Sequence, residues 1–213
     1  MSTLDLIWDA QTRYKLWSWT NGGVHYVARV IRRLHAHPHI CTARLGDGTH
    51  VPIPRSNTDE GAEVAVVKTA GSPEGAVALE REAQFYAQLE AAGVQGRAAP
   101  RCIGHFRGRE GGSETACLVL EYCAGTPGEE MHDVGRKIMA AAYALHGAGV
   151  MHGDLLDGHH FVKRGRRMVI VDFSAAVQHE CVHGREVRGS DGRRQIGVCP
   201  ELGALERLYG VYR

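Results

Sequence analysis

The segment 74–92 limits the possible folds more than any other part of the chain. Its apolar residues recur at the spacing of one helical face, at Ala78, Phe85 and Leu89. Gly93 follows as a stop signal, so the pattern predicts a helix that ends near Ala92. Glu82 lies on the same apolar face, four residues after Ala78. A buried, unpaired carboxylate is costly, so Glu82 requires a cationic partner from another element.

Other segments give strand and helix signals on both sides of this helix. Apolar runs, several rich in β-branched residues, predict strands at 63–68, 117–122, 160–163 and 168–173. Helical periodicity predicts a long helix over 131–145 and a short one over 201–209. Residues 183–197 are polar and Gly-rich, which predicts a loop, and residues 1–60 predict short antiparallel strands joined by turns.

Composition and charge limit the partners. A length of 213 residues suits one domain or two tightly packed lobes. The 25 Lys and Arg residues against 24 Asp and Glu give a net charge of +1, so no overall field attracts nucleic acid. No segment approaches the ~18 apolar residues of a membrane span, and the start lacks a signal-peptide pattern. The six cysteines form no Cys-x-x-Cys pair. We therefore expect a soluble, cytoplasmic protein with reduced thiols.

Two aspartates stand where chemistry is expected. Asp172 follows the apolar run 169–171 with no turn residues around it. A metal ion at the end of a strand would explain such a carboxylate, and a turn or N-cap aspartate is the alternative. Asp154 follows His152-Gly153 and precedes Asp172 by 18 residues (172 − 154). That separation allows a loop and a short hairpin, which would return the second aspartate beside the first.

The order of these segments resembles the protein-kinase-like superfamily. The resemblance rests on Val64–Lys68, Glu82, His152-Gly153-Asp154-Leu155 and Val171-Asp172-Phe173-Ser174. The branches most similar are RIO-like, lipopolysaccharide-kinase-like and short fungal kinase-like proteins. The resemblance implies an α+β, bilobal fold in a single domain over 1–213. Its small, β-rich N-lobe would span about 1–122, including helix 74–92, and a truncated, mainly helical C-lobe would span about 123–213.

The same resemblance implies an ATP-dependent phosphotransferase and assigns the site residues. Lys68 and Glu82 would hold the nucleotide phosphates, and Asp154 would position the acceptor hydroxyl. The remaining assignments are Glu121 and Tyr122 beside ATP, Asp172 and His159 on Mg²⁺ or Mn²⁺, and His152 and Phe173 as structural support. The acceptor would be a hydroxyl of a protein or a small molecule.

Departures from the family pattern leave a second interpretation open. No Gly-x-Gly-x-x-Gly precedes Lys68, and His159 stands where the family carries a metal-binding Asn. Only a short stretch follows Glu201, and Cys199-Pro200-Glu201 is better explained as a helix start. These departures favour a pseudokinase, a nucleotide-binding interaction module without turnover.

A histidine and cysteine group near the C-terminus raises the question of a further metal site. His179, Cys181 and His183 could supply three ligands. Their spacing matches no closed zinc motif, however, and 13 histidines in one chain make chance clusters common. The sequence alone therefore favours no metal at this segment.

Overall fold

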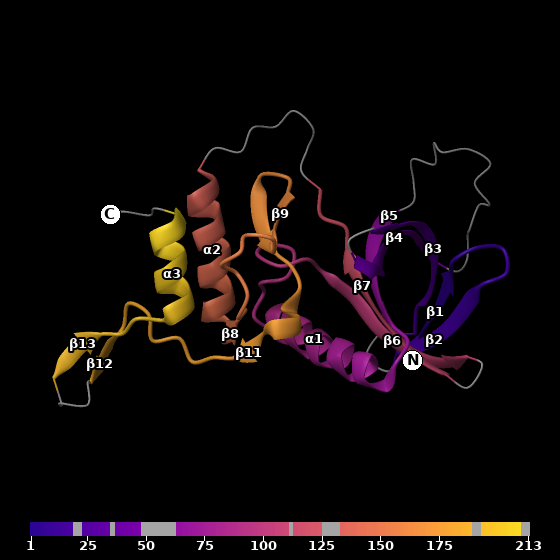
Figure 1. Cartoon of the computed structure of the whole chain (residues 1–213), viewed down its shortest axis with the longest axis horizontal. Helices are drawn as coiled ribbons and strands as arrows, with labels where there is room; N and C mark the ends of the chain where they lie inside the picture. The colour runs from indigo at the N-terminus through magenta and orange to yellow at the C-terminus, as the bar shows by residue number, and fades with distance from the viewer. Residues whose placement is uncertain are drawn as a thin grey trace. The chain divides into compact units, whose positions relative to one another are not determined.

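The computed structural model describes residues 1–18, 23–34, 37–47, 63–110, 113–124, 133–188 and 193–209 (Figure 1). The chain forms two compact units, and each unit is built from two separate stretches of the sequence. Unit 1 comprises Met1–Gln84 and Cys102–Tyr122, and unit 2 comprises Phe85–Arg101 and Cys123–Arg213.

Unit 1 is a closed barrel of seven strands. In barrel order they are β1 (Ser2–Ile7), β2 (Arg13–Ser18), β6 (Cys102–Glu110), β7 (Ser113–Glu121), β5 (Glu63–Ala70), β4 (His37–Asp47) and β3 (His25–Leu34). Neighbouring strands run antiparallel except β1 and β3, whose parallel pairing closes the barrel. Thr3 lies opposite His25 in that pair. Closure leaves the barrel without a free strand edge.

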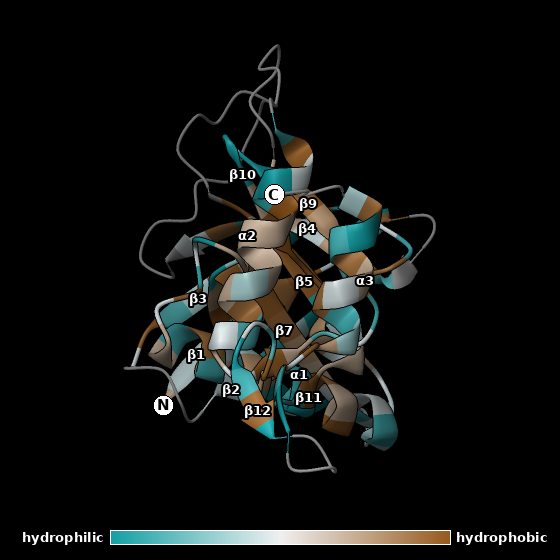
Figure 2. Ribbon diagram, turned by 90° about the vertical axis from the view of Figure 1, so that its left-hand side faces the viewer, coloured by the Kyte–Doolittle hydropathy of each residue, from teal (hydrophilic) through white to brown (hydrophobic). Residues whose placement is uncertain are grey.

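Apolar side chains at alternate positions fill the barrel interior. Because successive residues of a strand point to opposite faces, every second residue of a barrel strand faces inward. The buried interior includes Leu4 and Leu6, Cys41 and Ala43, Ala65 and Val67, and Cys117 and Val119. Figure 2 shows the hydrophobic colouring along β5 and β7. Lys68 follows inward-facing Val67, so its side chain lies on the outer face of the barrel.

Helix α1 (Pro73–Ala91) begins in unit 1 and ends in unit 2. Its first turn is capped by Ser72, whose hydroxyl accepts a hydrogen bond from the Gly75 N–H at 3.1 Å. The predicted helix 74–92 is therefore observed within one residue at each end. Glu82 is almost fully buried, and the cationic partner that it requires is Lys68.

Unit 2 combines helices with short strand pairs. Its helices are the end of α1, α2 (Val134–Gly147), α3 (Pro200–Tyr209) and the 3-10 turn η1 (Phe173–Ala175). Its strands form three pairs: β8 (Val150–Met151) with β11 (Val177–Gln178), β9 (Phe161–Arg164) with β10 (Arg167–Ile170), and β12 (Glu186–Arg188) with β13 (Arg194–Ile196).

The predicted bilobal, protein-kinase-like fold is wrong. The strands of unit 1 close into a mixed barrel, and strands outnumber helices along the described chain, where three α-helices are present. The C-terminal part is not mainly helical, because α2 and α3 contribute only 14 and 10 residues there and the short strands β8 to β13 lie between them. Residues 183–197, predicted as a loop, contain the β12–β13 pair. Sequence patterning misses the barrel because its closure depends on the β1–β3 pairing, which no local signal specifies.

Two expectations about the surroundings of the chain can be compared with the fold. No helix in the described ranges is both long enough and apolar enough to cross a membrane. No disulfide joins any of the six cysteines, all of which lie in the described ranges: Cys41, Cys117 and Cys199 are buried, and Cys102, Cys123 and Cys181 are partly buried.

Candidate functional site

The two aspartate-bearing loops of unit 2 lie against each other, and we call them the paired-aspartate loops: residues 152–154 and 171–175. The ring Nε2 of His152 donates a hydrogen bond to the Val171 carbonyl at 3.0 Å. Gly153 has a φ of +85°, and a Cβ at this position would lie 2.8 Å from the Ala175 carbonyl oxygen. Only glycine therefore fits the backbone contact between the two loops.

Asp172 adopts an uncommon backbone conformation at the start of η1. Its φ of 69° and ψ of 79° fall in the left-handed region, where non-glycine residues are rare and concentrate at functional sites. Its Oδ1 accepts a hydrogen bond from the Ser174 N–H at 3.3 Å. The next residue, Phe173, is fully buried, with its ring centroid 5.0 Å from that of Tyr86. Packing of Phe173 thus fixes the segment that carries Asp172.

His152 supports the loops from inside. Its ring is buried and lies edge-on to Phe173, with centroids 5.3 Å apart. Burial lowers the pKa of His152 below the usual range, although the hydrogen bond to Val171 partly opposes this shift. The carbonyl can only accept, so the proton sits on Nε2, and Nδ1 has no hydrogen-bond partner among the described residues. A neutral, packed imidazole is a structural element of the site.

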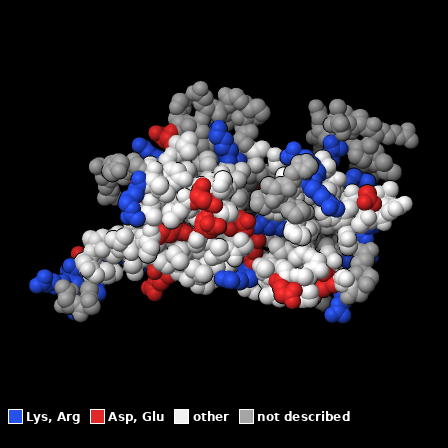
Figure 3. Space-filling view, viewed as in Figure 1, with Lys and Arg blue, Asp and Glu red and all other residues white. Residues whose placement is uncertain are grey.

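Asp154 is the exposed member of the paired-aspartate loops, with 57 % of its side chain accessible. The His160 Nε2 donates to its Oδ2 at 3.3 Å. Asp154, Asp157 and His160 each place a ligand atom within 4.8 Å of the others. Figure 3 shows acidic side chains gathered over the part of unit 2 that carries α2 and β9. Carboxylate oxygens in this arrangement suit Mg²⁺ or Mn²⁺.

His159, the predicted metal ligand, is exposed and lies outside this group. Its backbone N–H donates to Asp157 Oδ1 at 3.0 Å. The adjacent His160 takes the place beside Asp154 instead. Sequence spacing alone could not distinguish two consecutive histidines, because the turn 155–158 determines which ring points back to Asp154.

Glu201 binds the backbone of the Asp154 loop, a role that the sequence did not reveal. This buried carboxylate accepts hydrogen bonds from the N–H groups of His152 at 3.1 Å and Gly153 at 2.7 Å. It also accepts one from His146 Nε2 at 2.7 Å. Burial alone would raise the pKa of Glu201, but these three hydrogen bonds together lower it below the usual range. Glu201 is therefore an anionic anchor for the loop.

In unit 1, Lys68 and Glu82 form a buried ion pair. The Lys68 Nζ lies 2.8 Å from Glu82 Oε1 and 3.1 Å from Oε2. The side chains are 12 % and 2 % exposed. The other two predicted nucleotide contacts lie at the end of β7. Glu121 is partly buried and pairs with Ala65 of β5, and Tyr122 is exposed just after the strand.

Comparison with known proteins assigns no family. No protein-family model matches the chain, and no curated protein matches it. The resemblance to the protein-kinase-like superfamily is therefore not supported by these comparisons, and the barrel topology contradicts it. Function has to be argued from the residues of each unit.

Proposed function

We propose that the protein is an ATP-dependent phosphotransferase that moves the γ-phosphate to a hydroxyl of a protein or small-molecule acceptor. The observation that carries the proposal is the contact between the paired-aspartate loops. It brings His152 and Gly153, which precede Asp154, against Val171 and Ala175, which lie on either side of Asp172. One of these carboxylates is exposed, and the other sits in an uncommon backbone conformation.

Phosphoryl transfer requires positioning and charge neutralisation more than covalent chemistry from the protein. A divalent metal ion, when bound, would neutralise charge on the transferred phosphoryl group. The oxygens of Asp154 and Asp157 and the imidazole of His160 are close enough to hold such an ion. Asp172 lies outside this group of three, so its contact with a metal stays a prediction. The exposed Asp154 also suits a second task, which is to orient the acceptor hydroxyl and accept its proton.

Lys68 supports the proposal from unit 1. A mostly buried ammonium that is held by two carboxylate oxygens keeps one orientation, which suits a phosphate contact. A purely structural role, in which Lys68 neutralises the buried Glu82, is the alternative. A Lys68→Met variant with Glu82→Leu separates the two roles, because it removes the cation without leaving Glu82 unpaired.

A nucleotide-binding module without turnover is the second candidate, and one contact favours it. His160 already donates to the Asp154 carboxylate, so this group is less available to accept a proton from a hydroxyl. In this alternative, ATP and a divalent ion bind, and no phosphoryl group is transferred.

Two measurements separate these candidates. In a thermal-shift measurement, ATP with Mg²⁺ or Mn²⁺ should raise the melting temperature of the wild-type protein. A ligand that binds only the folded state stabilises that state. Phosphate release from ATP should then fall roughly 100-fold or more in Asp154→Asn.

The matched control is Asp133→Asn, which removes an exposed carboxylate that makes no capping hydrogen bond to α2. It should leave turnover unchanged. Metal-dependent stabilisation without Asp154-dependent turnover would leave only the binding module. No stabilisation by nucleotide would refute both candidates.

A further inference from the structure

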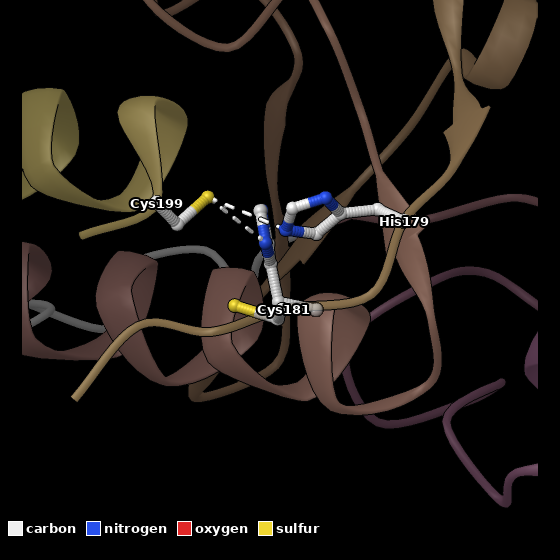
Figure 4. Close-up of side chains that lie close together, drawn as sticks. His179, Cys181 and Cys199 are labelled. Carbon is white, nitrogen blue, oxygen red and sulfur yellow. Dashed lines mark hydrogen bonds between the residues drawn. The ribbon is translucent and has the colours of Figure 1, made fainter. Parts of the chain in front are cut away.

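Two cysteines and two histidines converge in unit 2, and none of them belongs to the proposed phosphate chemistry. They are His146 in the last turn of α2, His179 and Cys181 after β11, and Cys199 just before α3. Each contributes one ligand atom, and these atoms all lie within 4.8 Å of one another. Figure 4 shows the side chains of His179, Cys181 and Cys199 close together.

We propose that these four side chains form a closed zinc site. Two imidazole nitrogens and two thiolates are a frequent ligand set of structural zinc, which is tetrahedral. With Zn–S near 2.3 Å and Zn–N near 2.05 Å, a tetrahedron separates sulfur and nitrogen by about 3.6 Å. Cys199 Sγ lies 3.5 Å from His146 Nδ1 and 3.5 Å from His179 Nε2. Both separations match the edges of such a tetrahedron.

The orientation of His146 supports the same assignment. Its Nε2 donates to the Glu201 carboxylate, so Nδ1 carries the lone pair that faces Cys199. Zinc-bound histidines commonly donate their second nitrogen to a carboxylate, which fixes the tautomer and strengthens the ligand. Glu201 would thus be the outer-sphere partner of the zinc.

His183 does not belong to the site, although the sequence groups it with His179 and Cys181. Its Nε2 donates to Glu206 Oε1 at 3.1 Å, and its Nδ1 accepts from the Cys199 N–H at 3.2 Å. Both ring nitrogens are therefore used. The fourth ligand is His146, which is 33 residues before His179 (179 − 146), so no local sequence motif could reveal the set.

A structural consequence follows from Glu201. This carboxylate binds the ligand His146 and also the N–H groups of His152 and Gly153. The zinc would therefore hold α2, the segment after β11 and the start of α3 around the Asp154 loop. The zinc assignment itself does not depend on the proposed phosphotransfer, because it rests on the ligand geometry alone.

The test is the metal content of the whole protein, purified under reducing conditions without chelator. Mass spectrometry of the metals should find about one zinc per wild-type chain. Cys199→Ser should lose at least nine-tenths of it, and Cys102→Ser, a control thiol on β6 outside the group, should keep it. Glu201→Gln should weaken zinc affinity roughly 10- to 100-fold.

A second measurement on the wild-type protein removes any dependence on how the variants fold. After chelation, added Co²⁺ should give the intense visible absorption of a tetrahedral site and a thiolate charge-transfer band. The inference is overturned if wild-type protein holds no zinc and gives no cobalt bands. It is also overturned if Cys199→Ser is folded and keeps its zinc, or if mapping finds a Cys181–Cys199 disulfide in place of metal.

Discussion

Two pairs of cysteines in this protein have different surroundings. Cys41 and Cys117 face the apolar interior of the barrel in unit 1, where burial raises the pKa of Cys41 to about 11 and raises that of Cys117 still further. Cys181 and Cys199 face two imidazoles in unit 2. Burial raises the pKa of Cys199 as well, but the N–H groups of Leu202 and Glu201 oppose this shift. Burial alone makes a thiol inert, and nitrogen partners make it a candidate ligand.

The same contrast extends to the charged groups. In unit 1, the buried carboxylate of Glu82 forms an ion pair with Lys68. In unit 2, the buried carboxylate of Glu201 accepts hydrogen bonds from three donors on two different segments. Glu82 is therefore balanced by an ion pair, whereas Glu201 joins a hydrogen-bond network that connects two candidate sites of unit 2.

The largest effect should come from breaking the pair in unit 1. Glu82→Leu leaves the Lys68 ammonium mostly buried without its carboxylate, which should lower the free energy of unfolding by about 3 kcal/mol. The double variant Lys68→Met, Glu82→Leu should lose much less, because no charge remains unpaired. Urea unfolding of both variants measures the difference. Equal losses of unfolding free energy in the two variants would show that the cost does not come from burying the Lys68 charge without Glu82.

Alkylation rates should separate the two cysteine pairs. In the zinc-free protein, iodoacetamide should modify the half-buried Cys181 roughly 100-fold faster than Cys41, because the raised pKa of Cys41 leaves little thiolate. Zinc should slow the modification of Cys181 and leave Cys41 and Cys117 unchanged. Mass spectrometry of the peptides resolves each site. If Cys181 reacts at the same rate with and without zinc, it is not a ligand.

Gly153→Ala should disturb the paired-aspartate loops. The added Cβ would meet the Ala175 carbonyl at 2.8 Å in a backbone of positive φ, so we expect a loss of about 2 kcal/mol in unfolding free energy. Gly165→Ala is the matched control in the β9–β10 turn. It also has a positive φ, +55°, but no atom lies within 4 Å of its added Cβ. The control should lose only about 1 kcal/mol. Equal losses would mean that the contact with Ala175 contributes nothing.

The smallest effect concerns acid stability of the barrel. Burial lowers the pKa of His105, against an opposing effect of Glu80, and its Nε2 has no hydrogen-bond partner in the described chain. A lowered pKa means that the unfolded chain binds the proton more readily. Stability should therefore be complete above the unfolded pKa, near 6.5, and fall as the pH drops through it towards the folded pKa. His105→Gln should reduce the difference in melting temperature between neutral and mildly acidic pH. An unchanged difference in melting temperature would exclude His105 as a cause of the acid sensitivity.

Sequence patterns found the local elements more readily than their assembly. Helix 74–92 and the need of Glu82 for a cation were visible because both depend on residues a few positions apart. The barrel was not visible, because β1 and β3 pair across an intervening strand. The set of zinc ligands was incomplete for the same reason: the sequence grouped His179 and Cys181, but His146 and Cys199 come from separate segments.

The aspartate loops are an intermediate case. Asp154 and Asp172 were selected from their immediate neighbours in the sequence, and the contact between Gly153 and Ala175 shows how their loops meet. The anchor Glu201 was assigned only to a helix start, because its partners His146 and His152 lie 55 and 49 residues away in sequence. Long-range hydrogen bonds of this kind leave no periodic signal.

Hydrogen exchange with and without zinc tests the central claim most directly, which is that unit 2 joins a metal site to the Asp154 loop through Glu201. Removal of zinc should speed amide exchange at His152 and Gly153, whose N–H groups donate to Glu201, and should leave strand β5 of the barrel unchanged. Equal protection of both amides in the zinc-free and zinc-loaded protein would contradict the account.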